Sequence, residues 1–282
     1  MTLSVGSWNI GGGILGESHQ RGATPELGHH IARLAQARPD VLCLQEAHEF
    51  HSGQRGQAAR IAAGTGVRWQ RTWAVSGSHL DPDADLSLAV LSRYPITRTR
   101  TVTFPNPGLS ATGPRGEHWD MFDKGYLVTE IALPHDGGTT GTAATTGTSG
   151  PTSVTVVDAH CFPFHYFGTT ATDPRFTGLW AGFADDLLTL ARSGPTVVCV
   201  DLNHEPVGDV LGALFDGGVY AAAFSDTPTT PQGLQQDHIV HTTADLALVE
   251  SSVVPTEADH HYCQARFEVR ADAQRQTTEG ER

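Results

Sequence analysis

The amino-acid sequence predicts an α/β sandwich, and three observations lead to that fold class. Strand-like apolar runs recur from one end of the 282-residue chain to the other. Helical patterns separate some of these runs at irregular spacing, which does not fit a regular strand-helix-strand repeat. The sequence shows no internal repeat. A chain of this length therefore fits a doubly layered α/β core folded as one unit.

Nine segments carry the continuous or alternating apolar pattern of β-strands. Many are rich in Val, Leu and Ile, and most are bounded by polar or turn-forming residues. In chain order they are LSVGSWNI (3–10), VLCLQ (41–45), LSLAVLS (86–92), YLVTEIAL (126–133), SVTVVDAH (153–160), TVVCVDLN (196–203), HIVH (238–241), LALVESSVV (246–254) and HYCQARFEV (261–269).

Two helices are predicted between the strands. Residues 25–37 follow Thr24, a suitable N-cap, and place Pro25 in the first turn. Their apolar positions recur at helical spacing, at Leu27, Ile31 and Leu34. Asp173-Pro174 opens the second helix in the same way, with an apolar stripe made of Phe176, Leu179, Trp180, Phe183, Leu187 and Leu190.

Domain organisation follows from the absence of a convincing boundary in the sequence. Residues 134–153 are rich in Gly, Thr and Ser, and they lie between two predicted strands. This composition predicts a mobile hairpin loop within one sheet and not an interdomain linker. We therefore expect a single domain over residues 1–270, followed by a disordered C-terminal tail at 271–282.

Composition narrows the class of protein. The formal net charge is −13 and no cluster of Lys and Arg occurs, which disfavours broad electrostatic adhesion to nucleic acid. A metal ion at a site can still supply local positive charge. The four cysteines lack CxxC spacing, so buried reduced thiols are expected. The opening segment does not resemble a signal peptide, and no run approaches the length of a membrane span, so we expect a cytoplasmic protein.

Polar side chains gather at the ends of the predicted strands, where a sandwich would bring them to one edge. Carboxylates, carboxamides and imidazoles at strand ends are the groups that hold a hard cation and move protons beside it. The residues concerned are Asn9, Glu46, His160, Asp201, Asn203, Asp237, His238, Asp259 and His260.

Each of these residues, taken singly, also has a structural explanation. Asn9 or Asn203 alone is more often a turn or capping residue. Glu46 follows a core strand, so its carboxylate needs either a partner or a metal. The Asp-His dipeptides are compatible with solvated loops in a chain with 15 histidines. Their ordered combination carries the functional argument.

That combination resembles the deoxyribonuclease I-like endonuclease/exonuclease/phosphatase superfamily. The family pattern is WN after an N-terminal strand, LQE, LSRYP, a strand ending in His, GDxN, an Asp near a late strand, and SDH. The matching residues occur in the family's order between residues 8 and 260. They are Trp8-Asn9, Leu44-Gln45-Glu46, Leu91-Ser92-Arg93-Tyr94-Pro95, His160, Asp201-Leu202-Asn203, Asp237 and Asp259-His260.

The resemblance implies a four-layered sandwich of two packed, mainly antiparallel β-sheets flanked by helices. It also implies a bound Mg²⁺ or Mn²⁺, which hard oxygen ligands favour over zinc. Glu46, with Asn9 and Asp259, would hold this metal. The resemblance assigns catalytic roles to five further residues, which are His160, Asp201, Asn203, Asp237 and His260. Asp237 would orient His260, Asp201 would orient or deprotonate the attacking water, and Asn203 and His160 would bind the phosphate oxygens.

The sequence departs from the family pattern at four places. Val200 replaces the Gly of GDxN and Ala258 replaces the Ser of SDH, but the chemical side chains of both motifs remain. Gly11 stands where some members carry a further metal-binding carboxylate. The aromatic and histidine-rich segment 160–168 replaces a simple THL, so His165 and Tyr166 are candidate substrate contacts, although its phenylalanines are equally compatible with a core role. The acidic partner of His160 is not evident, and Asp83 and Asp85 are candidates.

Three functions fit this resemblance. The first is a phosphodiesterase or nuclease, the second a phosphomonoesterase for a small molecule or lipid headgroup, and the third a noncatalytic binding protein on the same fold. The retained side chains disfavour the third. The partner we expect is a phosphate-ester substrate, either nucleic acid or a small molecule, since fold alone does not decide the substrate. No protein partner is evident.

Overall fold

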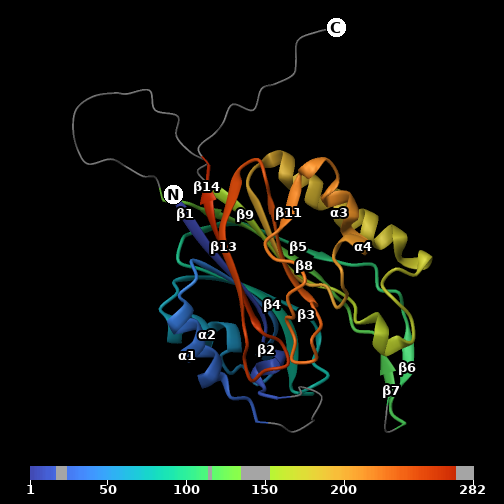
Figure 1. Ribbon diagram of the computed structural model, residues 1–282. Helices are drawn as coiled ribbons and strands as arrows, with labels where there is room; N and C mark the ends of the chain where they lie inside the picture. Colours follow the sequence, from blue (N-terminus) through green and yellow to red (C-terminus); the bar gives the residue numbers. More distant parts are fainter. Residues whose placement is uncertain (17–23, 114–115, 135–152, 271–282) are drawn as a thin grey trace, which may run out of the picture.

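The computed structural model describes residues 1–16, 24–113, 116–134 and 153–270 (Figure 1). Within these ranges the strands form two six-stranded sheets and a separate two-stranded hairpin. The first sheet runs in the order β13 (Leu246–Val254), β14 (Tyr262–Val269), β1 (Thr2–Asn9), β2 (Val41–Phe50), β4 (Ala84–Ser92) and β3 (Trp69–Gly77). The second runs in the order β11 (Tyr220–Ala222), β12 (Asp237–Thr242), β10 (Thr196–Asp201), β9 (Ser153–His160), β8 (Gly125–Ala132) and β5 (Ile96–Thr103). The hairpin pairs β6 (Ser110–Thr112) with β7 (His118–Asp120).

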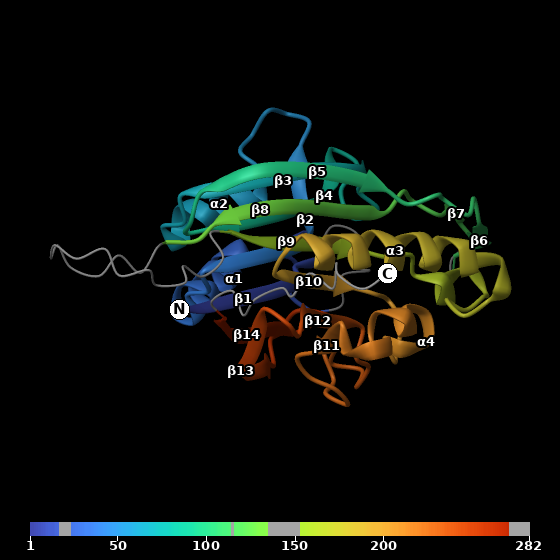
Figure 2. The same ribbon diagram turned by 90° about the horizontal axis from the view of Figure 1, so that it is seen from above.

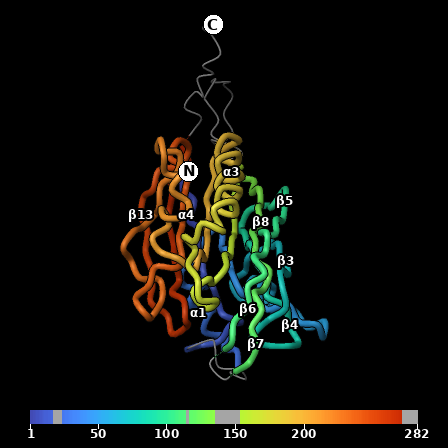
Figure 3. Tube along the Cα trace, turned by 90° about the vertical axis from the view of Figure 1, so that its right-hand side faces the viewer, coloured from blue at the N-terminus to red at the C-terminus, as the bar shows by residue number. Residues whose placement is uncertain are grey.

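The two sheets pack face to face, with β3 and β5 at one end and β13 and β11 at the other (Figure 2). Helices α1 (Leu27–Ala37) and α2 (Gln57–Thr65) cover the outer face of the first sheet. Helix α3 (Thr177–Ser193) lies along the outer face of the second sheet, with the short α4 (Gly208–Leu211) beside it (Figure 3). The short 3₁₀ helices are η1 (Gly11–Gly13), η2 (Phe164–Phe167), η3 (Pro174–Phe176), η4 (Gly212–Leu214) and η5 (Asp216–Gly218). The predicted four-layered, mainly antiparallel sandwich is confirmed.

Apolar side chains fill the spaces between these layers. One cluster lies between the sheets and includes Val5 and Val156. A second packs the first sheet against α1 and α2, and it includes Trp8 and Leu34. A third packs the second sheet against α3, where Trp180 and its neighbours are buried. Alternation along each strand sends residues to both faces, so both faces of the central strands are apolar.

Each sheet has a parallel pair of strands near its centre. In the first sheet β1 runs parallel to β2, and in the second β9 runs parallel to β10. The flanking pairs in both sheets are antiparallel. Across the interface β1 lies against β10 and β2 against β9. The carboxyl-terminal parts of all four strands therefore meet at one edge of the sandwich.

The structure contains all nine predicted strands and both predicted helices, with differences at their ends and edges. The first helix begins at Leu27 and not at Pro25, because Glu26 occupies the N-cap position. Asp173 does cap, accepting a hydrogen bond from Arg175, but a turn of 3₁₀ helix precedes α3. The sequence interpretation missed α2, the edge strands β3, β5 and β11, and the hairpin strands β6 and β7. Exposed polar residues interrupt the apolar alternation in β3 and β5, and β11, β6 and β7 are each only three residues long.

The predicted hairpin loop lies between β8 and β9, which pair antiparallel as neighbours in one sheet. Its residues 135–152 and the predicted tail 271–282 lie outside the described residues. Among the residues described, no helix combines the length and apolar character needed to cross a membrane.

Candidate active site

The ends of the two parallel pairs carry the candidate site. Asn9 is the last residue of β1, His160 of β9 and Asp201 of β10, and each of these side chains is buried. In the second sheet, the ladder between β9 and β10 stays in register up to the pair Asp201 and His160. Regular strand geometry alone therefore places these two residues side by side.

Glu46 reaches the same edge by a different backbone route. The pairing of β2 with β4 shifts between Leu44 and Ala47, and Glu46 within this bulge has a φ of 54°. A positive φ is uncommon for a residue with a side chain and requires support from its surroundings. The bulge turns the Glu46 carboxylate out of the strand alternation and toward His160, whose Nε2 lies 3.7 Å from Glu46 Oε1.

A buried carboxyl group of the second sheet supports this bulge. Gln45 Nε2 donates to Asp158 Oδ1 over 2.6 Å, and the Ala89 backbone N–H donates to Asp158 Oδ2 over 3.0 Å. Asp158 is fully buried, and burial raises its pKa well above the usual value. The side chain therefore links the two sheets by hydrogen bonds, next to the residue pair Gln45-Glu46.

Asp201 lies at the centre of the polar cluster. Its Oδ2 accepts a hydrogen bond from Asn9 Nδ2 over 2.8 Å and lies 3.4 Å from His160 Nε2. Its Oδ1 accepts the Asn203 backbone N–H over 3.0 Å. The Asn9 Oδ1 atom in turn accepts the backbone N–H of Gly11 over 3.0 Å. Gly11 thus fixes the orientation of Asn9 through its backbone.

His260 and Asp237 form the second half of the cluster. His260 Nδ1 lies 2.8 Å from Asp237 Oδ2, and its Nε2 lies 3.9 Å from Asp201 Oδ2. The His260 carbonyl accepts hydrogen bonds from Trp8 Nε1 and Thr256 Oγ1. Both the ring and the backbone of this histidine are therefore held in place.

The charges of this cluster shift the protonation of its members in opposite directions. Burial raises the pKa of Asp201 to about 7, although the charge of His260 opposes the rise. Burial alone would lower the pKa of His260, but the carboxylates of Asp237 and Asp201 hold it well above its usual value. At neutral pH the structure thus combines a protonated imidazole with a carboxyl group close to its titration midpoint.

Lys124 is a buried member of the site that the sequence interpretation did not identify. Its Nζ lies 3.0 Å from both ring nitrogens of His160 and 3.8 Å from Glu46 Oε1. Burial and the Lys124 ammonium group hold the pKa of His160 well below its usual value, so its ring is neutral and can accept a hydrogen bond from Lys124. One signal was available in the sequence, since this is the single lysine among 18 Lys and Arg residues.

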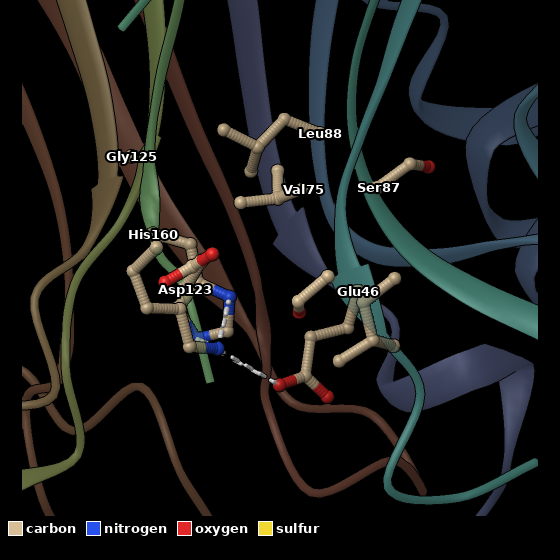
Figure 4. A pocket seen from close by; sticks show the side chains of 10 residues that line it. Glu46, Val75, Ser87, Leu88, Asp123, Gly125 and His160 are labelled. Atoms are coloured by element: carbon tan, nitrogen blue, oxygen red, sulfur yellow. Dashed lines mark hydrogen bonds and ion pairs between the residues drawn. The ribbon is translucent and has the colours of Figure 1, made fainter. Parts of the chain in front are cut away.

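Lys124 also balances the charge of Glu46. Burial alone would raise the pKa of Glu46, but the positive charges of His79 and Lys124 lower it to about 2. Figure 4 shows Glu46 and His160 directed toward each other beside a pocket. The pocket is lined by Glu46, Val75, Ser76, Leu86, Ser87, Leu88, Asp123, Lys124, Gly125 and His160.

The structure does not pair His160 with the aspartates considered from the sequence. In the described part of the chain, the carboxylates within 4 Å of His160 belong to Glu46 and Asp201. Asp85 instead pairs with His51 on the surface, and Asp83 lies in the turn before β4. The bulge explains the difference, because it turns Glu46 toward His160.

The aromatic segment after His160 is divided between the core and the surface. Phe162 and Phe164 are buried in the cluster under α3. His165 and Tyr166 on η2 face outward, with ring centroids 4.1 Å apart. Partial burial and the carboxylates of Asp259 and Glu46 raise the pKa of Tyr166.

The donor chemistry of the cluster fits a hard cation. Glu46 and Asn9 offer oxygen atoms, which Mg²⁺ and Mn²⁺ prefer. Asp259 directly precedes His260, its Oδ1 atom is buried, and its charge helps to raise the pKa of His260. A second group, Asp201, Asp237 and His260, offers one ligand atom each within 4.8 Å of one another. Within this second group the His260 ring is already hydrogen-bonded to Asp237. The Asp237 Oδ1 atom is buried and has no hydrogen-bond partner among the described residues.

A family model described as "Endonuclease/Exonuclease/phosphatase family" matches residues 6–263. The chain belongs to this family. The match spans the residues from β1 to β14 and includes the whole candidate site. Among members of this family the common activity is hydrolysis of phosphoester bonds.

Solved structures show the same fold at low sequence identity. An endonuclease/exonuclease/phosphatase from Beutenbergia cavernae DSM 12333 aligns with a TM-score of 0.65 and 18% identity, covering 95% of this chain and 72% of that one. The human Nocturnin catalytic domain, solved with a bound sulfate anion, aligns at 0.62 and 14%, covering 95% of both chains. A humanised TDP2 from D. rerio aligns at 0.53 and 13%, covering 95% and 99%. The comparison with curated protein sequences found no match.

Proposed function

We propose that this protein is a divalent-metal-dependent phosphodiesterase. The observation that carries the proposal is the convergence of Glu46, Asp201 and His260 at one edge of the sandwich, from different strands and both sheets. Burying carboxylates this close together costs free energy, and proteins usually retain such a cluster where function requires its negative charge. Binding a cation and accepting a proton are two such functions.

Glu46, with Asn9 and Asp259, would hold Mg²⁺ or Mn²⁺. Bound there, the cation would polarise a phosphoryl oxygen and stabilise the charge that develops on it. The low pKa of Glu46, lowered to about 2 against the effect of burial, keeps its carboxylate ionised at any physiological pH. We infer that the cation would share this charge with Lys124, which now lies 3.8 Å from Glu46 Oε1.

The phosphate group would lie at the edge of the sandwich where the strand ends of the two sheets meet, against nitrogen donors. Lys124 and the Nδ2 group of Asn203 are donors suited to nonbridging oxygens, together with the imidazole of His160. Asn203 is held in a left-handed backbone conformation with a φ of 54°. Its Nδ2 donates to the Cys161 carbonyl over 3.1 Å, which leaves its second amide proton for a substrate.

Asp201 would accept the proton of the attacking water, and His260 would bind the phosphate. A carboxyl group with a pKa raised to about 7 is suited to accept a proton from water near neutral pH. The attacking water oxygen would form a bond to phosphorus as the bond to the leaving oxygen breaks, and the water proton would pass to Asp201. His260, protonated and oriented by Asp237, would donate a hydrogen bond to the phosphate.

A substrate panel tests this proposal. The protein would be incubated with bis-p-nitrophenyl phosphate, p-nitrophenyl phosphate, plasmid DNA, single-stranded DNA and RNA, each with Mg²⁺, with Mn²⁺ and after exhaustive chelation. We expect metal-dependent release of p-nitrophenol from the diester, at a higher rate than from the monoester. Turnover that survives chelation, or hydrolysis of the monoester alone, would show that the proposed function is wrong.

A further inference from the structure

Exposed aromatic side chains border the candidate active site, and they come from segments that are far apart in the sequence. Phe122 is 41% exposed and Tyr166 is 42% exposed. Exposed aromatic rings next to a polar site offer flat apolar surface on which part of a ligand can stack. Two further rings, those of Trp119 and His79, lie against them.

The first aromatic pair comes from two segments that also contribute residues to the pocket beside Glu46. The ring centroids of His79 and Phe122 are 6.2 Å apart. His79 follows Ser76 by three residues and Phe122 directly precedes Asp123, and both Ser76 and Asp123 line that pocket. The loop carrying Phe122 is fixed, since Asn106 Nδ2 donates to the Met121 carbonyl and to Asp123 Oδ1.

The second pair also comes from two segments that carry residues of the candidate site. Trp119 on β7 and Tyr166 on η2 meet edge to face, with ring centroids 6.1 Å apart. Trp119 lies five residues before Lys124, whose ammonium group contacts His160, and Tyr166 lies six residues after His160. Contacts between β6 and η2 hold the hairpin against this segment. Both pairs are thus anchored to residues of the catalytic cluster.

The charges around these rings do not suit a long polyanion. Asp120 and Asp123 lie in the same segment as the rings, and Asp120 pairs with His118. The sequence has no Lys or Arg cluster, and its single lysine is buried inside the site. A nucleic-acid backbone needs several phosphate contacts from cationic side chains. The rings are instead suited to stack on one flat group.

We propose that His79, Phe122, Trp119 and Tyr166 form an aromatic platform that binds a flat aromatic group, a nucleobase or an aryl ring, joined to the phosphate of a small phosphodiester substrate. This inference rests on the proposed function and specifies its substrate class. It assigns the exposed rings to the part of the substrate that does not react. Selectivity would then come from stacking, while the catalytic cluster acts on the phosphate that all such esters share.

Three diesters with the same leaving group test the platform. The p-nitrophenyl esters of thymidine 5′-phosphate, phenyl phosphate and methyl phosphate carry the same charge and release the same product. We expect kcat/KM for the thymidine ester, the phenyl ester or both to exceed that for the methyl ester by about 10-fold or more, the scale of one aromatic stacking contact. The two aromatic arms distinguish a nucleobase from a simple aryl group.

Variants assign the preference to the rings. Phe122→Ala and Tyr166→Ala should each lower the ratio of aromatic to methyl kcat/KM by about 5-fold or more. Trp69→Ala is the matched control, because Trp69 is 36% exposed at the start of β3, the end opposite His79. It should leave the ratio unchanged. Equal kcat/KM for all three esters, or a ratio that neither ring variant alters, would overturn the platform.

Equilibrium binding separates this inference from the proposed function. Thymidine 5′-monophosphate or phenyl phosphate should bind about 10-fold more tightly than methyl phosphate, and Phe122→Ala should remove most of that difference. Hydrolysis of none of the esters would refute the proposed function, while the binding difference would still support the platform. Hydrolysis without any binding difference would refute the platform alone.

Discussion

The two parallel strand pairs at the centre of the sandwich reach the same edge in different ways. In the second sheet, β9 and β10 stay in register until His160 and Asp201 lie side by side. In the first sheet, β1 ends regularly at Asn9, but β2 bulges at Glu46, which has a φ of 54°. The second sheet positions its residues by strand geometry, whereas the first needs a local distortion supported by Asp158. Function and backbone irregularity therefore coincide on one side of the site.

The largest effect is expected from the residue in the bulge. Glu46→Gln keeps the side-chain shape but removes the charge that a cation needs, so metal-dependent turnover should fall by about 10³-fold or more while the melting temperature changes little. Metal affinity can be measured by Mn²⁺ titration of the same protein. Glu49→Gln, a half-buried neighbour on β2, is the matched control and should retain activity.

This variant also separates the two sets of metal donors. If Glu46→Gln bound Mn²⁺ as tightly as the unaltered protein and Asp201→Asn did not, the cation would belong to Asp201, Asp237 and His260.

A smaller loss of turnover is expected from Asp201 and from its neighbour His260. Asp201→Asn and His260→Ala should each lower kcat by roughly 10²-fold or more, because each removes a group proposed to move or hold a proton. Metal binding should persist in His260→Ala, in contrast to Glu46→Gln. Near-normal turnover of either variant at saturating substrate would show that its assigned role is wrong.

Asp158 tests whether the bulge depends on the opposite sheet. Asp158→Asn keeps the shape of the side chain and one acceptor oxygen, so it can replace part of this hydrogen bonding. We expect Asp158→Asn to keep kcat within about 3-fold. Asp158→Leu would remove the acceptor of the buried Ala89 N–H and leave Gln45 Nε2 with its 3.4 Å hydrogen bond to Ser7 Oγ, at a cost of roughly 2–5 kcal/mol in the free energy of unfolding.

Turnover measurements distinguish a positioning role for Asp158 from a purely structural one. Asp158→Leu should lower kcat by about 10-fold or more at a temperature where the protein is fully folded, with weaker Mn²⁺ binding. Unchanged metal binding in the folded variant would indicate that Glu46 keeps its position without this bridge.

The smallest effect concerns the helical layer that covers β1. His30 on α1 packs against Trp8, with ring centroids 4.6 Å apart, and burial lowers its pKa from 6.5 to about 4. The His30 ring therefore takes up a proton at a higher pH in the unfolded chain than in the folded protein. The stability contribution is therefore complete above about pH 6.5 and is lost as the pH falls toward about 4.

Urea unfolding at about pH 7.5 and about pH 5 measures this contribution. The difference in unfolding free energy between His30→Phe and the unaltered protein should shift in favour of the variant by roughly 2 kcal/mol on acidification. A difference that does not change with pH would show that the buried His30 ring does not carry this acid sensitivity.

The sequence predicted the central strands and the residues at their ends because both leave local signals. Apolar runs such as 196–203 end directly in polar side chains, and the ordered motifs identified the family. The edge strands β3 and β5 were not predicted, because one face of each is exposed and polar. Long-range pairing is also invisible locally, so the sequence leaves the acidic partner of His160 open and offers Asp83 and Asp85 only as candidates.

Lys124 shows why part of the site could not be predicted. The dipeptide Asp123-Lys124 reads as an ordinary solvated turn, and only the packing of β8 against β9 places its ammonium group beside His160. The rings of Phe122 and Trp119 were missed for the same reason. Their neighbours, His79 and Tyr166, lie more than 40 residues away along the chain.

The single lysine has a practical consequence for chemical labelling. Amine-directed reagents such as succinimidyl esters or pyridoxal phosphate with borohydride react with side-chain ammonium groups after deprotonation, and this sequence offers them one lysine side chain, that of Lys124. Burial lowers the pKa of Lys124, which increases the reactive fraction, while its 7% exposure restricts access to small reagents. Incorporation of one label at residue 124, and its suppression by a bound phosphate ester, would therefore report occupancy of the catalytic edge directly by mass spectrometry.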